Sequence, residues 1–135
     1  MVEQLYAIDV FAAKWGADDH KRFLLRLALD EISGVINERA ARRSDTHVLM
    51  QLTLIAREPS DAEKSASEPP AFEIHLGDDA AEFNPFRLAR GPIVDEPGQT
   101  EEPDVEALGV YFVQNRAQNV FSRHYQGFNT TMMVI

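Results

Sequence analysis

The segment DHKRFLLRLALDEISGVINERAARR, residues 19–43, decides the fold class of this protein. Apolar residues recur in it at steps of three and four, the spacing of one helix face: Leu25, Leu29, Ile32, Ile36 and Ala40. Further apolar residues widen this stripe: Phe23, Leu24, Leu27, Ala28 and Val35. Because Asp18 or Asp19 can cap its start, the segment predicts one long amphipathic helix.

Three segments downstream have the character of β-strands. Residues 46–57 alternate with one apolar face and one half-apolar face, which predicts an interior strand partly covered on both sides. Residues 71–77 alternate more cleanly, with apolar residues on one face and Glu73 and His75 on the other. We expect these two strands to pair antiparallel. The β-branched residues of segment 129–135 predict a closing strand.

Two further segments fit either a helix or a strand. Residues 2–15 fit a helix that Gly16 would end, and their first half also fits a short strand. Residues 104–126 contain a helical stripe, yet residues 110–113 would also suit a buried strand followed by a hairpin near residues 116–119. We favour a helix for both segments. The stripe in the second is formed by Val110, Val113, Ala117, Val120 and His124.

The middle of the chain, residues 58–106, is acidic and rich in proline. It holds all seven prolines and fourteen acidic residues against three basic ones, a local charge of −11, whereas the whole chain carries −9. Proline removes a backbone donor and fixes φ, so this segment should be rich in loops. We expect one strand and one short helix, residues 79–83, inside it, and mobile acidic loops at residues 58–70 and 91–103.

These patterns predict a single domain over residues 1–135, since domains most often run to ~100–150 residues. The fold class is α+β: a mostly antiparallel sheet with one long amphipathic helix, residues 19–43, packed on a face, and a loop-rich acidic middle segment. Several families of small proteins share this layout, and no residue motif singles out one of them.

Composition and missing motifs exclude several functions. The chain has no cysteine, so it has no disulfide scaffold, thiol nucleophile or thiolate metal site. It lacks both a run of ~18 apolar residues and a basic region leading into an apolar one, so we expect a cytoplasmic protein without membrane contact. Its acidic balance argues against a nucleic-acid partner. With no nucleophile elbow and no phosphate loop, we expect no catalytic residues, no metal, no cofactor and no enzymatic activity.

Two groups of polar residues are candidates for a binding site. His75, Asp78 and Asp79 lie close together at a strand end and could hold a divalent cation, pair an acid with a base, or line a ligand pocket. The alternative is that both aspartates cap the short helix. Arg116, Arg123 and His124 lie in a terminal segment without any acid and could receive an anion or an acidic neighbour. On one helix the two arginines would face the same way; alternatively they only solvate its surface.

We therefore predict a small, acidic, non-catalytic protein-binding module, such as a regulator, an inhibitor or an assembly subunit. Its partner would be a protein, of basic character if the acidic segment binds it, and the chain itself would form a homo-oligomer or a larger assembly. Two alternatives remain open. One is a repeated structural subunit joined through its apolar C-terminal strand. The other is a small-ligand-binding or hydrolytic domain that uses His75, Asp78 and Asp79.

Overall fold

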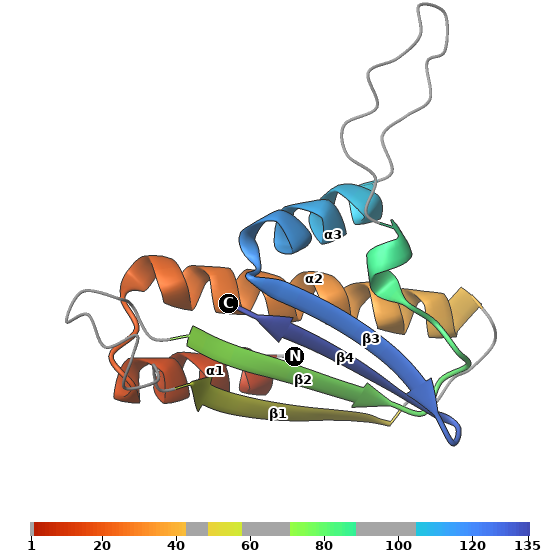
Figure 1. Ribbon diagram of the computed structural model, residues 1–135, viewed down its shortest axis with the longest axis horizontal. Coiled ribbons are helices and arrows are strands. Elements are labelled where there is room, and N and C mark those ends of the chain that lie inside the picture. The colour runs from red at the N-terminus through yellow and green to blue at the C-terminus, as the bar shows by residue number, and fades with distance from the viewer. Residues whose placement is uncertain (1, 43–48, 58–70, 89–104) are drawn as a thin grey trace, which may run out of the picture.

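The computed structural model describes residues 2–42, 49–57, 71–88 and 105–135, and their elements are labelled in Figure 1. The described chain forms, in order, α1 (Val2–Lys14), α2 (Asp19–Arg42), β1 (Met50–Arg57), β2 (Ala71–Asp78), the 3₁₀ helix η1 (Pro85–Leu88), α3 (Val105–Arg116), β3 (Asn119–Tyr125) and β4 (Phe128–Val134). The predicted acidic loops, residues 58–70 and 91–103, lie outside the described ranges.

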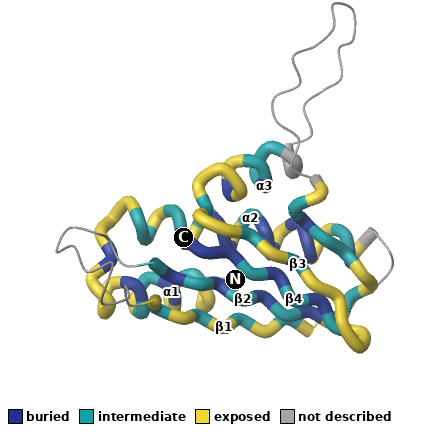
Figure 2. The backbone as a smooth tube through the Cα atoms, viewed as in Figure 1, coloured by how far each residue is buried: buried dark blue, intermediate teal, exposed yellow. Residues whose placement is uncertain are grey.

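The four strands form one antiparallel sheet in the order β1-β2-β4-β3. The predicted antiparallel pairing of β1 with β2 is confirmed. The prediction that β1 is an interior strand is wrong: β1 lies at one edge and β3 at the other. The C-terminal strand β4 is central and hydrogen-bonded on both sides, so no free edge is left on it for another chain. In Figure 2, β4 alternates between buried and half-buried residues, whereas β3 is mostly exposed.

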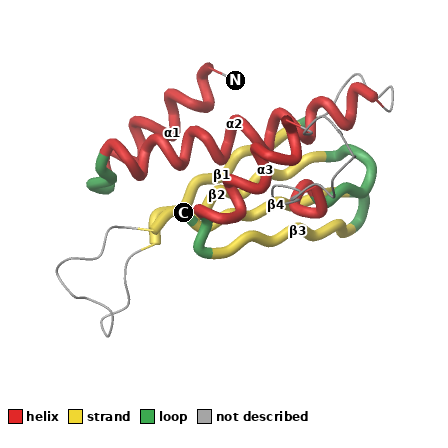
Figure 3. Tube along the Cα trace, turned by 90° about the horizontal axis from the view of Figure 1, so that it is seen from above, coloured by secondary structure: helices red, strands yellow, loops and turns green. Residues whose placement is uncertain are grey.

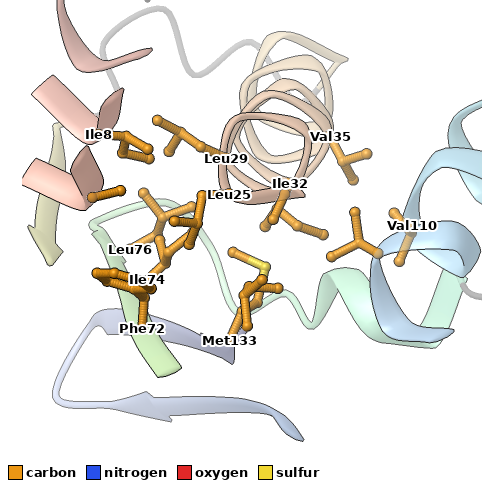
Figure 4. Close-up of a cluster of buried hydrophobic side chains, with 14 of the residues drawn as sticks. Ile8, Leu25, Leu29, Ile32, Val35, Phe72, Ile74, Leu76, Val110 and Met133 are labelled. Atoms are coloured by element: carbon orange, nitrogen blue, oxygen red, sulfur yellow. The ribbon is translucent and has the colours of Figure 1, made fainter. Parts of the chain in front are cut away.

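All three α-helices lie on the same face of the sheet, as the view from above in Figure 3 shows. The core fills the space between them and the strands (Figure 4). Its largest fully buried members come from every layer: Ile8, Leu25, Leu29, Ile32, Phe72, Ile74, Leu76, Val110 and Met133. The α+β class is therefore confirmed. The prediction of only one long helix is wrong, because α1, with 13 residues, packs on the same face beside α2, with 24.

The junction between α1 and α2 shows why residues 2–15 are helical. Gly16 has a φ of 81° and donates to the Ala13 carbonyl, while Ala17 donates to the Ala12 carbonyl. This pair of bonds is the Schellman ending, which needs a residue in the left-handed region. Asp18 then caps α2, because its carboxylate accepts the Lys21 amide at 2.7 Å. Gly16 ends α1 as predicted.

Helix α2 is buried on more than one side because it contacts α1, α3 and the sheet. The predicted stripe is buried, from Leu25 at 1% exposure to Ala40 at 4%. Ser33 is also buried and donates its hydroxyl to the Leu29 carbonyl within the helix. Phe23 is the exception, because it is 53% exposed at the start of α2. Arg26 lies 3.5 Å from the Asp9 carboxylate and so connects α2 to α1.

The segment 104–126 combines both alternatives that its sequence allows. Residues 105–116 are the helix α3, and residues 119–125 are the strand β3, so a continuous helix through residue 126 is wrong. The hairpin turns at Gln126-Gly127, not near residues 116–119. The physical reason is tertiary: β3 pairs with the whole length of β4, and a longer helix would forgo those ladder bonds.

The predicted short helix at residues 79–83 is also wrong. Residues 80–82 form bends, and one turn of 3₁₀ helix follows at η1. The Asp78 carboxylate accepts the Ala80 amide at 3.1 Å, and this local bond competes with a helical turn. No described helix is long and apolar enough to cross a membrane.

The β3–β4 turn yields a first prediction. Gln126 and Gly127 both have positive φ, at 50° and 75°, as a two-residue type I′ turn requires. We expect Gly127→Ala to lower the free energy of unfolding by about 1–2 kcal/mol, because an added Cβ is strained there. We expect Gln126→Asn to raise it by about 0.5 kcal/mol, since asparagine tolerates this conformation better. Urea denaturation measures both changes, and unchanged midpoints would contradict the turn assignment.

The contact between α2 and α3 yields a second prediction. The Glu31 carboxylate lies against Gly109, where an added Cβ would overlap it. Burial first, and then the neighbouring Asp30 charge, raise the pKa of Glu31 above its ordinary value. The folded state therefore holds this proton more tightly than the unfolded state, and stability is lost as pH rises through the raised pKa.

We expect Glu31→Gln to be slightly more stable than the wild type at neutral pH, because it removes a partly buried charge next to Asp30. Below the ordinary carboxyl pKa, about pH 4, both proteins are neutral at this position and the difference should disappear. Thermal melts across this pH range measure it. A difference that is constant with pH would contradict the role of the Glu31 charge.

Candidate functional site

His75 and Asp78 lie on opposite faces of the sheet, although they are close in the sequence. Side chains alternate along β2, so Asp78 points to the helix-covered face, where it is 2% exposed. His75 points to the other face. Its Nε2 lies 3.9 Å from Glu73 Oε2, too far for a hydrogen bond. The pocket that would use His75 together with the two aspartates is therefore not formed by the described residues.

Asp78 belongs to a buried polar network at the end of the sheet. Its Oδ1 accepts the Asn129 amide at 2.8 Å, and the same Nδ2 group lies 3.1 Å from the carbonyls of Ala80 and Ala81. These acceptors fix the orientation of the Asn129 amide. Its oxygen then lies 2.8 Å from His124 Nδ1 and accepts the Phe83 amide at 3.4 Å. Hydrogen bonds thus connect Asp78 in the interior through Asn129 to His124 at the surface.

This network determines which nitrogen of His124 carries the proton. An amide oxygen can only accept, so the Nδ1 atom that faces it must donate. In a neutral imidazole the proton therefore lies on Nδ1, and Nε2 is the atom with a free lone pair. Asp79 has a different role: its carboxylate accepts the Leu49 amide at 2.8 Å, just before β1 begins.

A pocket of about 430 Å³ lies beside His124, between α2, β3 and the segment that leads into η1. Arg39 of α2 and Arg87 of η1 line it, together with His124 and Ser122 of β3. The remaining wall is formed by residues 82–84. The guanidinium of Arg39 lies over the Phe83 ring, with its carbon 4.8 Å from the ring centre, and this contact holds it at the wall.

The predicted basic group does not come together as a patch. Arg116 is exposed in the last turn of α3, whereas Arg123 and His124 lie on β3, where neighbouring side chains point to opposite faces. Arg123 lies over the Tyr125 ring at 4.9 Å, on the face without helices. The shared helix face expected for Arg116 and Arg123 is wrong, because the helix ends at Arg116.

The face without helices is the second candidate surface, and no described element lies over it. Three of its large side chains are at least 40% exposed: Ile55, Phe121 and Tyr125. Between them lie two half-buried apolar residues of β4, Met132 opposite Phe121 and Phe128 opposite Tyr125. We call these five residues the open-face cluster.

One edge of the open face also carries charge. Arg57 Nε of β1 lies 3.5 Å from Glu73 Oε1 of β2, and Glu73 is the acid nearest His75. The Phe128 ring packs over Gly77, where an added Cβ would clash with it. Most of the apolar residues of this face therefore lie on β3 and β4, with Arg123 between Phe121 and Tyr125, and the ion pair lies toward β1.

Sequence reasoning missed Arg39, Arg87 and Asn129, and it missed the open-face cluster. One signal was present: residues 119–125 alternate, with Val120, Ser122 and His124 on one side and Phe121, Arg123 and Tyr125 on the other. No such signal exists for Arg39 and Arg87, because they come from separate elements that only the fold brings together. No group of three or more acidic or histidine side chains within the described ranges could hold a metal ion.

The buried network yields a third prediction. We expect Asn129→Ala to lower the free energy of unfolding by about 1–3 kcal/mol, because it removes one of the two amide donors to the buried Asp78 carboxylate and a donor to the Ala80 and Ala81 carbonyls. Asn119→Ala is the matched control, since Asn119 is exposed at the start of β3, and its change should stay within about 0.5 kcal/mol. Urea denaturation measures both. Equal losses in the two variants would contradict the network.

Comparison of this chain with protein-family models, with curated proteins and with solved structures finds no match.

Proposed function

We propose that this protein is a non-catalytic assembly module that binds a second copy of itself through the open face of its sheet. The observation that carries this proposal is the open-face cluster. Exposed apolar residues are ordinary when scattered, but here four of the five form two cross-strand pairs on neighbouring strands, Phe121–Met132 and Tyr125–Phe128. Such a grouping on an exposed face is typical of an interaction site. The three helices cover the opposite face only, so the cluster has no described partner within the chain.

The register of the sheet places the cluster suitably for a twofold contact. Met132 is opposite Phe121 on one side and His75 on the other, so it lies near the middle of the face. A twofold axis close to Met132 would bring the apolar half of one copy onto the apolar half of the other. Such an interface is self-complementary, as dimer interfaces are. The charged pair Arg57–Glu73 would then lie toward the rim.

The size of the face agrees with this partner. Four strands at ~4.8 Å spacing and seven to eight residues at ~3.4 Å each span roughly 19 by 25 Å, about 480 Å² in projection. Side chains raise the accessible area of such a face above its projection, toward the ~800 Å² that a stable interface buries on each partner.

The charge of the face argues against a basic protein as its partner. Among the described residues, Arg57 and Arg123 lie on it against one acid, Glu73, so a basic partner would meet like charge there. The acidic segment 58–106 belongs to a separate proposal, that of a basic partner bound by its charge. Most of that segment lies outside the described residues.

The fourth prediction tests self-association by light scattering after size exclusion. We expect the wild type to have twice the mass of one chain and Phe121→Glu to weaken association at least tenfold, because a charge would be buried in an apolar contact. Phe112→Glu is the matched control, since Phe112 is similarly exposed, at 52% against 48%, but lies on α3. A monomeric wild type at ~100 μM would refute the proposal. So would a Phe121→Glu variant that associates as the wild type does.

A further inference from the structure

The pocket beside His124 has a different character from the open face. It is lined mostly by polar side chains and lies on the helix side of the sheet, so self-association through the open face would leave it accessible. Its volume of about 430 Å³ falls within the range of small-molecule sites, ~300–1,000 Å³. The question is which ligand its side chains fit.

Two arginines make the pocket locally cationic in an acidic protein. Arg39 and Arg87 come from different elements, α2 and η1, and both line the pocket. Neither guanidinium forms an ion pair with any other residue in the described ranges. A cation–π contact with the Phe83 ring holds the Arg39 guanidinium at the wall, and such a contact does not consume the hydrogen-bond donors of the guanidinium.

His124 is a third side chain that could contact a ligand in the pocket, and its orientation is fixed without a ligand. The buried Asp78–Asn129 pair holds Nδ1, so only Nε2 is available to a molecule in the pocket. Asn129 acts here as a positioning residue. Ser122 adds a hydroxyl two residues earlier on the same side of β3.

We propose that this pocket binds a small phosphorylated molecule, with the phosphate between Arg39 and Arg87. Phosphate offers several acceptor oxygens in different directions, so it can accept from two guanidinium forks and the Ser122 hydroxyl together. His124 Nε2 donates to it when the ring is protonated and accepts from a phosphate or ligand hydroxyl when the ring is neutral.

Glu82, on the pocket wall, shapes this preference. Its carboxylate repels an anion placed next to it, so the phosphate would lie on the arginine side. The carboxylate can accept hydrogen bonds from hydroxyl groups on the rest of the ligand. The pocket is also too large for a phosphate ion alone. Its volume and the Glu82 carboxylate together favour a phosphate monoester of a hydroxylated compound.

The fifth prediction tests this site by isothermal titration calorimetry with inorganic phosphate and with glycerol phosphate at constant ionic strength. We expect glycerol phosphate to bind with a Kd below about 1 mM and inorganic phosphate more weakly. Arg39→Gln and Arg87→Gln should each weaken binding at least tenfold, because each removes one fork. Arg116→Gln is the matched control, an exposed arginine outside the pocket, and it should bind as the wild type does.

A measurement on the wild type avoids any effect of the variants on folding. In ¹H–¹⁵N spectra we expect His124 to carry its proton on Nδ1 when neutral, and added glycerol phosphate should shift its Nε2 resonance and the amides of Phe83 and Ser122. Absence of binding by both probes at ~10 mM would overturn the proposal. It would also be overturned if both arginine variants bound glycerol phosphate as tightly as the wild type does, or if the shifts were confined to residues outside the pocket.

Discussion

The burial of α2 against one face of the sheet is the interaction on which the rest of this structure depends. Leu25, Leu29 and Ile32 of α2 meet Ile74 and Leu76 of β2 in a core that is almost closed to solvent. Apolar area removed from water is the main stabilising contribution in a domain of this size. Helices α1 and α3 then flank α2 and cover the remaining apolar edges of the same face.

This one-sided arrangement determines where the protein can interact. A four-stranded sheet has two faces, and the helices cover only one, so the other face offers its side chains to a partner. Apolar residues on that face, such as Phe121 and Met132, would be unnecessary for stability if the face served only as a solvated surface. The proposal of self-association follows from this excess of apolar side chains on a face that the helices leave open.

The end of the sheet follows a second physical constraint, the need to satisfy buried polar groups. Asp78 and Asn129 are 2% and 1% exposed, and such groups are stable inside a protein only when they are hydrogen-bonded. The same bonds that satisfy Asn129 hold His124 at the wall of the pocket. A structural requirement thus orients a surface histidine at the wall of a pocket that two arginines also line, which is the basis of the proposed phosphate site.

Part of this protein was predictable from local patterns alone. Periodicity and capping residues act over a few positions, and they account for the long helix α2 at residues 19–42 and for the ending of α1 at Gly16. The alternating patterns of β1 and β2 likewise indicated two strands that pair antiparallel. The site residues His75, Asp78 and Asp79 were identified as a group by their adjacency in sequence. Alternation along a strand separates His75 from Asp78, and the same local rule could have shown this.

The amino-acid sequence by itself determined the α+β class, the long helix and the two faces of β2, because each depends on residues within one or two turns or pleats of one another. Only the tertiary structure decided that residues 119–125 are a strand, that β4 is central, and that His124 lines one pocket with Arg39 and Arg87. Asn129 and Asp78 are 51 residues apart, and their bond exists because β4 pairs with β2 in one register. Strand order and register depend on how much apolar surface the whole sheet buries, and this total cannot be read from any short stretch of sequence.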